Sequence, residues 1–129
     1  MRRESRTVLY RPVGRRELEL IREGGFRAFP NPPPGQSIFK SVLTREYAAD
    51  VARNWSAKEK TPAYSDVYVT RFYVDSAFLS RYSQHQVAGS SHWEYLIPAE
   101  ELDELNGHIR GIIELVAEYH YPGVPDDAA

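Results

Sequence analysis

The order of the predicted strands and helices limits this chain more than any other feature of its sequence. Two helical segments lie in its first half, separated by short extended pieces, and the second half consists mostly of predicted strands. The regular strand–helix alternation that builds a parallel, doubly wound sheet is missing. The sequence therefore predicts the α+β class, with a split or antiparallel-rich sheet and two to three helices packed against it.

The predicted strands are rich in β-branched and aromatic residues, and prolines, glycines or polar turns separate them. Pro12 and Gly14 are expected to end the first strand, and the prolines between residues 31 and 35 predict an irregular loop. On the last strand, alternation predicts one shared face for Ile113, Leu115, Ala117 and Tyr119. The strands are expected at residues 7–11, 38–43, 66–74, 84–88, 92–97 and 109–119, with a short extended piece at 26–29.

The first predicted helix covers residues 15–23. Leu18 and Ile21 lie on its inner face at helical spacing. Gly24 and Gly25 follow it, and glycine commonly ends a helix because it accepts the left-handed backbone conformation.

The second predicted helix covers residues 45–55 and has Thr44 as its N-cap. Its apolar residues repeat at helical spacing, so we expect it to pack against the sheet. The packing residues are expected to be Val51, Ala52 and Trp55. A short helical turn is predicted after Asp75, and a short acidic helix ends near Leu105.

Composition places the chain among ordinary globular proteins. Its 129 residues suit a single domain, with residues 1–6 and 121–129 expected to be flexible tails. The absence of cysteine excludes disulfides, thiolate zinc sites and a cysteine nucleophile. No apolar run reaches the length of a signal peptide core or a bilayer span, so we expect a cytoplasmic protein without a membrane partner.

The charge distribution leaves two interpretations open. The net charge of −2 argues against nonspecific nucleic-acid binding, but residues 1–30 hold eight Arg against four Glu. A solvated, self-complementary surface explains this pattern. The alternative is a nucleic-acid surface built from Arg2, Arg3, Arg6, Arg15 and Arg16.

Common catalytic motifs are missing from the sequence. It has no glycine-rich dinucleotide fingerprint, no P-loop and no G-x-S-x-G elbow. His92-Trp93-Glu94 matches the H-x-E of zinc deaminases, but the required P-C-x-x-C is missing. We therefore expect no metal site.

Three features remain as candidates for ligand binding, and the third, the Glu94 strand, follows below. Arg11 ends the first strand, and its planar guanidinium suits a diphosphate, although a surface ion pair is the plainer interpretation. Phe39, Ser41 and Tyr47 lie where a strand enters a helix. The faces of Phe39 and Tyr47 suit a flat heteroaromatic ring, and the alternative is that Phe39, Tyr47 and Trp55 are core residues.

Glu94 is a carboxylate within an aromatic strand. Alternation places it with His92 and Leu96 on one face, opposite its apolar neighbours. Burying a charge is costly unless it is paired or bound, so Glu94 either lies in a functional cleft or pairs with an arginine.

In combination, these residues resemble the ADP-ribosyltransferase fold. The likeness lies in Leu9-Tyr10-Arg11, in Phe39-Lys40-Ser41 before the helix around Ala48-Ala49, and in Glu94-Tyr95-Leu96-Ile97-Pro98, in that order. Over residues 7–119 the chain is also similar to short bacterial proteins loosely labelled "ADP-ribosylation/crystallin". That second likeness lies in residues 9–14, 27–30 and 94–102.

The resemblance implies NAD as the substrate, with ADP-ribose transferred to an unspecified acceptor or NAD hydrolysed. Glu94 and Arg11 would be the catalytic residues, and Arg11 would line a pocket facing Glu94 from a neighbouring strand. The implied NAD-binding residues are Arg11, Tyr10, Phe39, Ser41, Tyr47 and His92. His92 stands where arginine-modifying members place Glu or Gln, which argues against arginine as the acceptor. The alternative is a non-catalytic binding or interaction module, regulatory or antitoxin-like, on the same fold.

Overall fold

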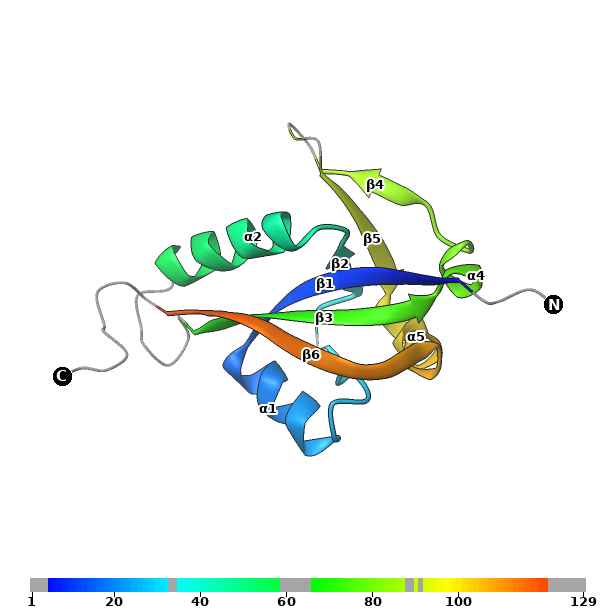
Figure 1. The fold of residues 1–129 in the computed structure, drawn as a ribbon, viewed down its shortest axis with the longest axis horizontal. Helices are drawn as coiled ribbons and strands as arrows, with labels where there is room; N and C mark the ends of the chain where they lie inside the picture. Colours follow the sequence, from blue (N-terminus) through cyan, green and yellow to red (C-terminus); the bar gives the residue numbers. More distant parts are fainter. Residues whose placement is uncertain (1–4, 33–34, 59–65, 88–89, 91, 121–129) are drawn as a thin grey trace.

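Six strands form one antiparallel sheet in the computed structural model, which describes residues 5–32, 35–54, the backbone of 55–58, and residues 66–87, 90 and 92–120 (Figure 1). Their order across the sheet is β4-β5-β2-β1-β3-β6. The strands are β1 (Arg6–Gly14), β2 (Ile38–Val42), β3 (Val67–Asp75), β4 (Gln84–Gln86), β5 (Trp93–Pro98) and β6 (Ile109–Tyr119). The predicted α+β class is confirmed.

The sheet has two halves that meet at a narrow junction. One half consists of β1, β3 and β6, and the other of β4, β5 and β2. β1 pairs with β3 along its whole length from Arg6 to Gly14, but with β2 at a single position, where Tyr10 opposes Val42. We call this junction of β1 and β2 the seam.

β1 is longer than the sequence predicts. It begins at Arg6, which therefore belongs to the strand and not to an N-terminal tail. It also continues through Pro12 to Gly14, so the predicted strand end was wrong. Beyond Tyr10, none of the described strands pairs with the β2-facing edge of β1, and proline, which lacks an N–H, is tolerated at such an edge.

Helices cover both faces of the sheet (Figure 1). α1 (Arg15–Glu23), α4 (Ser76–Leu79) and α5 (Leu102–Gly107), which follows η1 (Ala99–Glu101), contribute to the larger hydrophobic cluster on one face. α2 (Arg45–Lys58) packs over a smaller cluster on the other face. Within the described part of the chain, no helix has the length and apolar character needed to cross a bilayer.

α1 ends as its glycines predict. Leu18 and Ile21 are buried on its inner face. Gly25 has a φ of 76° and its N–H donates to the Arg22 carbonyl at 3.0 Å, while the Phe26 N–H donates to the Ile21 carbonyl at 2.9 Å. These two bonds form a Schellman motif, which satisfies carbonyls at the helix end.

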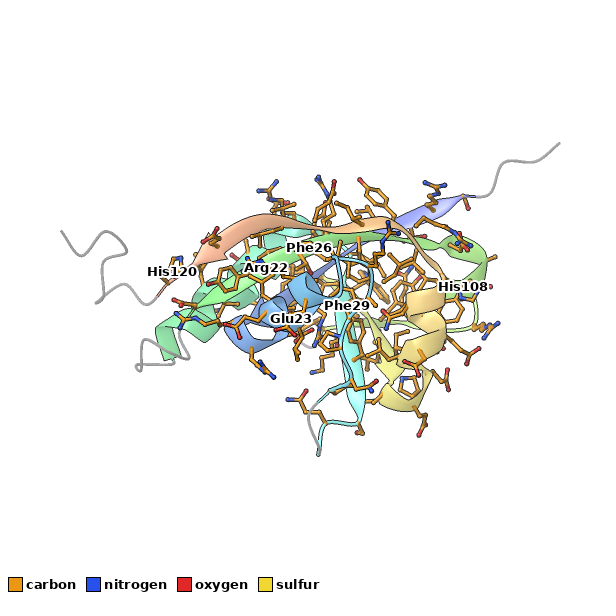
Figure 2. All side chains as sticks on the ribbon, turned by 90° about the horizontal axis from the view of Figure 1, so that it is seen from below. Arg22, Glu23, Phe26, Phe29, His108 and His120 are labelled. Carbon is orange, nitrogen blue, oxygen red and sulfur yellow. The ribbon has the colours of Figure 1, made fainter. Side chains whose placement is uncertain are left out.

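Residues 26–29 leave α1 without joining the sheet as a strand. Asn106 of α5 replaces a strand partner, because its amide accepts from the Phe29 N–H at 2.9 Å and donates to the Phe29 carbonyl at 3.0 Å. The Ile113 N–H donates to the Phe26 carbonyl at 2.7 Å. Phe26 and Phe29 both lie beside α1 in Figure 2, and Phe29 is buried in the larger cluster.

α2 begins as predicted, but a different stripe of it packs on the sheet. The Thr44 hydroxyl accepts from the Tyr47 N–H at 3.2 Å, as expected of an N-cap. Ala48 and Ala52 are fully buried, four residues apart. Val51 was expected to join them, but it lies on the neighbouring stripe and is only half-buried. The Trp55 side chain lies outside the described residues.

An irregularity in β6 corrects the predicted pattern of that strand. Leu115 and Ala117 oppose consecutive residues of β3, so Val116 is an extra residue. Such a bulge reverses the alternation of faces beyond it. Ile113 accordingly packs in the larger cluster, whereas Ala117 and Tyr119 pack on the α2 side, so these residues do not share one face.

Candidate functional site

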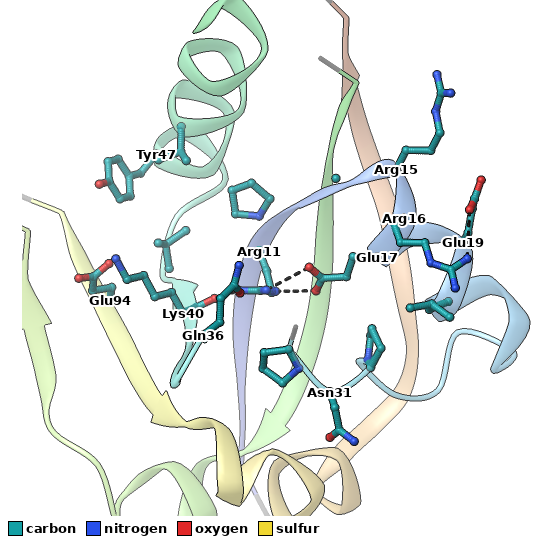
Figure 3. Close-up of a pocket in the computed structure, with 17 residues that line it drawn as sticks. Arg11, Arg15, Arg16, Glu17, Glu19, Asn31, Gln36, Lys40, Tyr47 and Glu94 are labelled. Carbon is teal, nitrogen blue, oxygen red and sulfur yellow. Dashed lines mark hydrogen bonds and ion pairs between the residues drawn. The ribbon is translucent and has the colours of Figure 1, made fainter. Parts of the chain in front are cut away.

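A cleft of about 780 Å³ opens at the seam (Figure 3). This volume falls within the range of small-ligand sites. Both halves of the sheet and both longer helices contribute to its walls. The lining residues are Arg11, Pro12 and Gly14 of β1, Lys40 and Val42 of β2, Glu94 of β5, Tyr47 and Val51 of α2, Arg15, Arg16, Glu17, Glu19 and Leu20 of α1, and Pro30, Asn31, Pro32 and Gln36.

Arg11 enters the cleft from the α1 face of the sheet. Its Nε and Nη2 donate to the two Glu17 carboxylate oxygens at 2.8 and 3.1 Å, and its Nη1 donates to the Lys40 carbonyl at 2.8 Å. The guanidinium carbon lies 4.2 Å from the centre of the Phe39 ring. With its side chain only 16% exposed, Arg11 is held by neighbours on several sides.

Glu94 enters the cleft from the α2 face. It opposes Val42, which belongs to the α2-side cluster, while its neighbour Tyr95 is buried in the larger cluster on the other face. The predicted alternation of this strand is therefore confirmed. Glu94 makes no ion pair or side-chain hydrogen bond with any described residue, although it is half-buried.

Tyr47 of α2 forms an aromatic wall beside Glu94. Its ring stacks on His92 with the ring centres 4.4 Å apart and the planes 13° from parallel. Burial raises the pKa of the Tyr47 hydroxyl, and the nearby Glu94 carboxylate raises it further. Tyr47 is therefore a neutral, oriented ring within the electrostatic reach of Glu94.

The cations at the start of α1 have acidic partners. Arg15 pairs with Asp66, and Arg16 lies 3.7 Å from Glu19. Burial would raise the pKa of Asp66, but hydrogen bonds from His120 and Arg15 outweigh it and lower that pKa.

The cleft unites three of the predicted site residues, Arg11, Tyr47 and Glu94. His92 lies behind Tyr47 in the ring stack and does not line the cleft. Arg11 was expected on a strand neighbouring that of Glu94, but β2 lies between β1 and β5. The two side chains also approach the cleft from opposite faces of the sheet, because Arg11 lies over Phe39 of the larger cluster and Glu94 opposes Val42 of the α2-side cluster.

Three other predicted residues do not line the cleft. Tyr10 packs on the α2-side cluster, and Phe39 is buried in the larger cluster beneath Arg11. Ser41 is 1% exposed, and its hydroxyl has no hydrogen-bond partner among the described residues. Phe39 therefore follows the core-packing interpretation, and Ser41 is a buried polar residue outside the cleft lining.

Sequence reasoning missed Lys40 and Glu17 as lining residues. The position of Lys40 could have been predicted from the sequence. It lies between the buried residues Phe39 and Ser41 in β2, so alternation places its side chain on the other face. Glu17 had none, since its approach to Arg11 depends on the turn from β1 into α1.

The remaining predictions concern metals and nucleic acids. Among the described residues, no group of three or more His, Asp or Glu side chains is placed to hold a metal ion. Arg2 and Arg3 lie outside the described residues, and Arg6 is exposed on β1. Arg15 and Arg16 line the cleft and begin α1, whereas Arg6 lies at the opposite end of β1.

No protein-family profile, no curated protein and no solved structure matches the chain. Its function must be inferred from the geometry and chemistry of the cleft.

Proposed function

We propose that the cleft binds NAD and that Glu94 acts on the bond between nicotinamide and ribose. The observation that carries this proposal is the position of Glu94, a half-buried carboxylate that lines the cleft without an ion pair or side-chain hydrogen bond to a described residue. Desolvating an unpaired carboxylate is costly, and such groups concentrate at functional sites. The likeness of the Glu94 strand to that of ADP-ribosyltransferases agrees with this role.

The proposed reaction breaks the bond between C1′ of the ribose and the nicotinamide nitrogen. Nicotinamide leaves with the bonding electron pair, and positive charge develops on the ribose. The Glu94 carboxylate stabilises that charge and accepts a hydrogen bond from a ribose hydroxyl, as carboxylates do in glycoside hydrolysis. An acceptor or water then attacks C1′ and loses a proton, which completes ADP-ribose transfer or NAD hydrolysis.

The walls of the cleft suit a ligand with a flat ring. Tyr47 lines the cleft, and its stack with His92 limits the rotation of its ring. Val42, Val51 and Pro12 add apolar surface nearby. An apolar wall with a few polar groups is the usual composition of a small-molecule site.

A second candidate is a non-catalytic nucleotide-binding or interaction module. The observation that favours it is the engagement of Arg11 with Glu17 and the Lys40 carbonyl. An arginine whose donors are occupied by the protein offers fewer of them to a diphosphate. In this candidate Glu94 contributes to affinity alone, and NAD is not consumed.

The test is nicotinamide release from NAD by the wild-type protein and by Glu94→Gln, with protein and small-molecule acceptors supplied. We expect Glu94→Gln to keep the fold and reduce release by about 10²–10³-fold, as when one electrostatic stabiliser of a transition state is lost. Glu19→Gln is the matched control, because Glu19 lines the same cleft but is exposed.

Thermal unfolding with NAD separates the two candidates only when it is combined with the nicotinamide-release assay. NAD at 100 times its dissociation constant should stabilise the protein by about 2.7 kcal/mol in either case. Stabilisation without nicotinamide release from wild type favours the non-catalytic module. Equal release from wild type and Glu94→Gln contradicts the catalytic role of Glu94.

A further inference from the structure

The cations of the cleft differ in what already neutralises them. Four basic side chains line it, and Arg11, Arg15 and Arg16 each have a carboxylate partner. Lys40 is exposed and makes no ion pair with any described residue. A ligand anion therefore meets an uncompensated ammonium at Lys40 and a compensated guanidinium at Arg11.

Lys40 also lies between the two residues to which the sequence assigns chemistry. Its carbonyl accepts the 2.8 Å hydrogen bond from Arg11 Nη1. In the β2–β5 register, Lys40 lies diagonally opposite Glu94 on the same face of the sheet, because Val42 opposes Glu94 directly. Figure 3 shows the Lys40 side chain extending across the cleft toward Glu94.

Arg11 has contacts that suit a structural role at the seam. It starts from β1, contacts β2 through the Lys40 carbonyl and the Phe39 ring, and reaches α1 through Glu17. β1 and β2 share only one paired position, and these side-chain contacts add to the two hydrophobic clusters that join the halves of the sheet.

We propose that Lys40, and not Arg11, supplies the positive charge that binds the diphosphate of the ligand, while Arg11 links β1 to β2 and α1 at the seam. Only the identity of the ligand as NAD rests on the proposed function. With the three arginines paired, Lys40 and Glu94 are a cation and an anion on one wall that have no ion-pair partner among the described residues. A phosphate joined to a ribose fits both, because the phosphate binds the ammonium and a ribose hydroxyl donates to the carboxylate.

Calorimetric titration with ADP-ribose and with inorganic pyrophosphate tests the assignment on wild type, Lys40→Gln, Lys40→Arg and Arg16→Gln. Lys40→Gln should weaken binding of both ligands by roughly tenfold to hundredfold, the usual loss for a charge-assisted hydrogen bond. Lys40→Arg should retain most of the affinity. Arg16→Gln removes another exposed cation from the same cleft and should bind nearly as wild type.

The fold should not be affected by Lys40→Gln, since the side chain is exposed and makes no ion pair with a described residue. Unchanged affinity in Lys40→Gln, an equal loss in Arg16→Gln, or no binding of either ligand by wild type overturns the Lys40 assignment. If Lys40→Gln still binds NAD as wild type does, the Lys40 assignment is contradicted and the proposed function stands. Lys40-dependent pyrophosphate binding without NAD binding supports the assignment and contradicts the proposed function.

Discussion

Two buried hydroxyls of the sheet have opposite surroundings. Thr70 donates from Oγ1 to the Arg11 carbonyl at 2.8 Å, whereas the Ser41 hydroxyl has no partner among the described residues. Both are 1% exposed. A buried polar group without a partner costs free energy, while a paired one adds a small net stabilisation.

Ser41→Ala should therefore leave the unfolding free energy unchanged or raise it by up to about 1 kcal/mol. Thr70→Val is the control and should lower it by about 1 kcal/mol, because it removes a satisfied hydrogen bond. Urea denaturation measures both changes. NAD affinity should not respond to Ser41→Ala, since Ser41 does not line the cleft. A loss of affinity would restore Ser41 as a binding residue.

At single residues, the sequence predicts the features that alternation determines and misses those that depend on three-dimensional contacts. The sequence predicts that Glu94 lies on the face of β5 opposite Tyr95 and Ile97, and both of these residues are buried on the other face. The partner of Arg11 could not be predicted, because strand and helix patterns do not specify how α1 is oriented relative to β1. Glu17 is only six residues from Arg11 and still gave no signal.

At the scale of elements, the seam should weaken when Arg11 loses its planar donor group. Arg11→Lys keeps the charge but cannot make both bonds to Glu17 together with the bond to the Lys40 carbonyl. We expect it to lower the unfolding free energy by about 1–3 kcal/mol. Arg16→Lys is the control, because the Arg16 side chain is 77% exposed and should tolerate the change.

A double-mutant cycle separates the ion pair from the other contacts of Arg11. Arg11→Lys and Glu17→Gln together should cost less than the sum of the two single changes, because each removes the same interaction. Strict additivity, measured by urea denaturation, would show that Arg11 and Glu17 do not stabilise each other.

The elements that sequence predicts best are those with a long periodic pattern. α2 and β3 were located closely, because helical spacing and a dense run of β-formers each extend over many residues. The bulge at Val116 was not predicted, since Val116 and its neighbours Leu115 and Ala117 are all apolar and fit either face. The sequence predicts that β1 ends at Pro12, because proline usually ends a strand. Pro12 is tolerated within β1 since β2 pairs with β1 only at Tyr10, and the sequence does not show where that pairing stops.

For the whole molecule, acid should destabilise the fold through Asp75. The Arg110 guanidinium donates to this nearly buried carboxylate and lowers its pKa below the ordinary 3.8, against the effect of burial. Because the folded pKa lies below the unfolded one, the stabilisation is complete above the unfolded pKa. It is lost as the pH falls through the folded value.

Asp75→Asn should consequently be less stable than wild type at pH 7 and differ less from it at pH 3. Chemical denaturation across this range measures the difference. Asp103→Asn changes an exposed residue of α5 and serves as the control, with little expected effect at either pH. If the difference in unfolding free energy between wild type and Asp75→Asn stays constant with pH, the pH-dependent contribution of Asp75 is contradicted.

β1, the first strand of the chain, lies in the centre of the sheet, and this placement governs how the protein reaches its fold. Its main partner, β3, begins only at Val67, and the pairing joins Arg6 to Asp75. Such non-local pairings require large loops to close, so folding should take milliseconds to seconds, not the microseconds of small helical proteins. During synthesis β1 emerges from the ribosome long before β3, and its β3-facing edge lacks its native partner until residues 67–75 have been made.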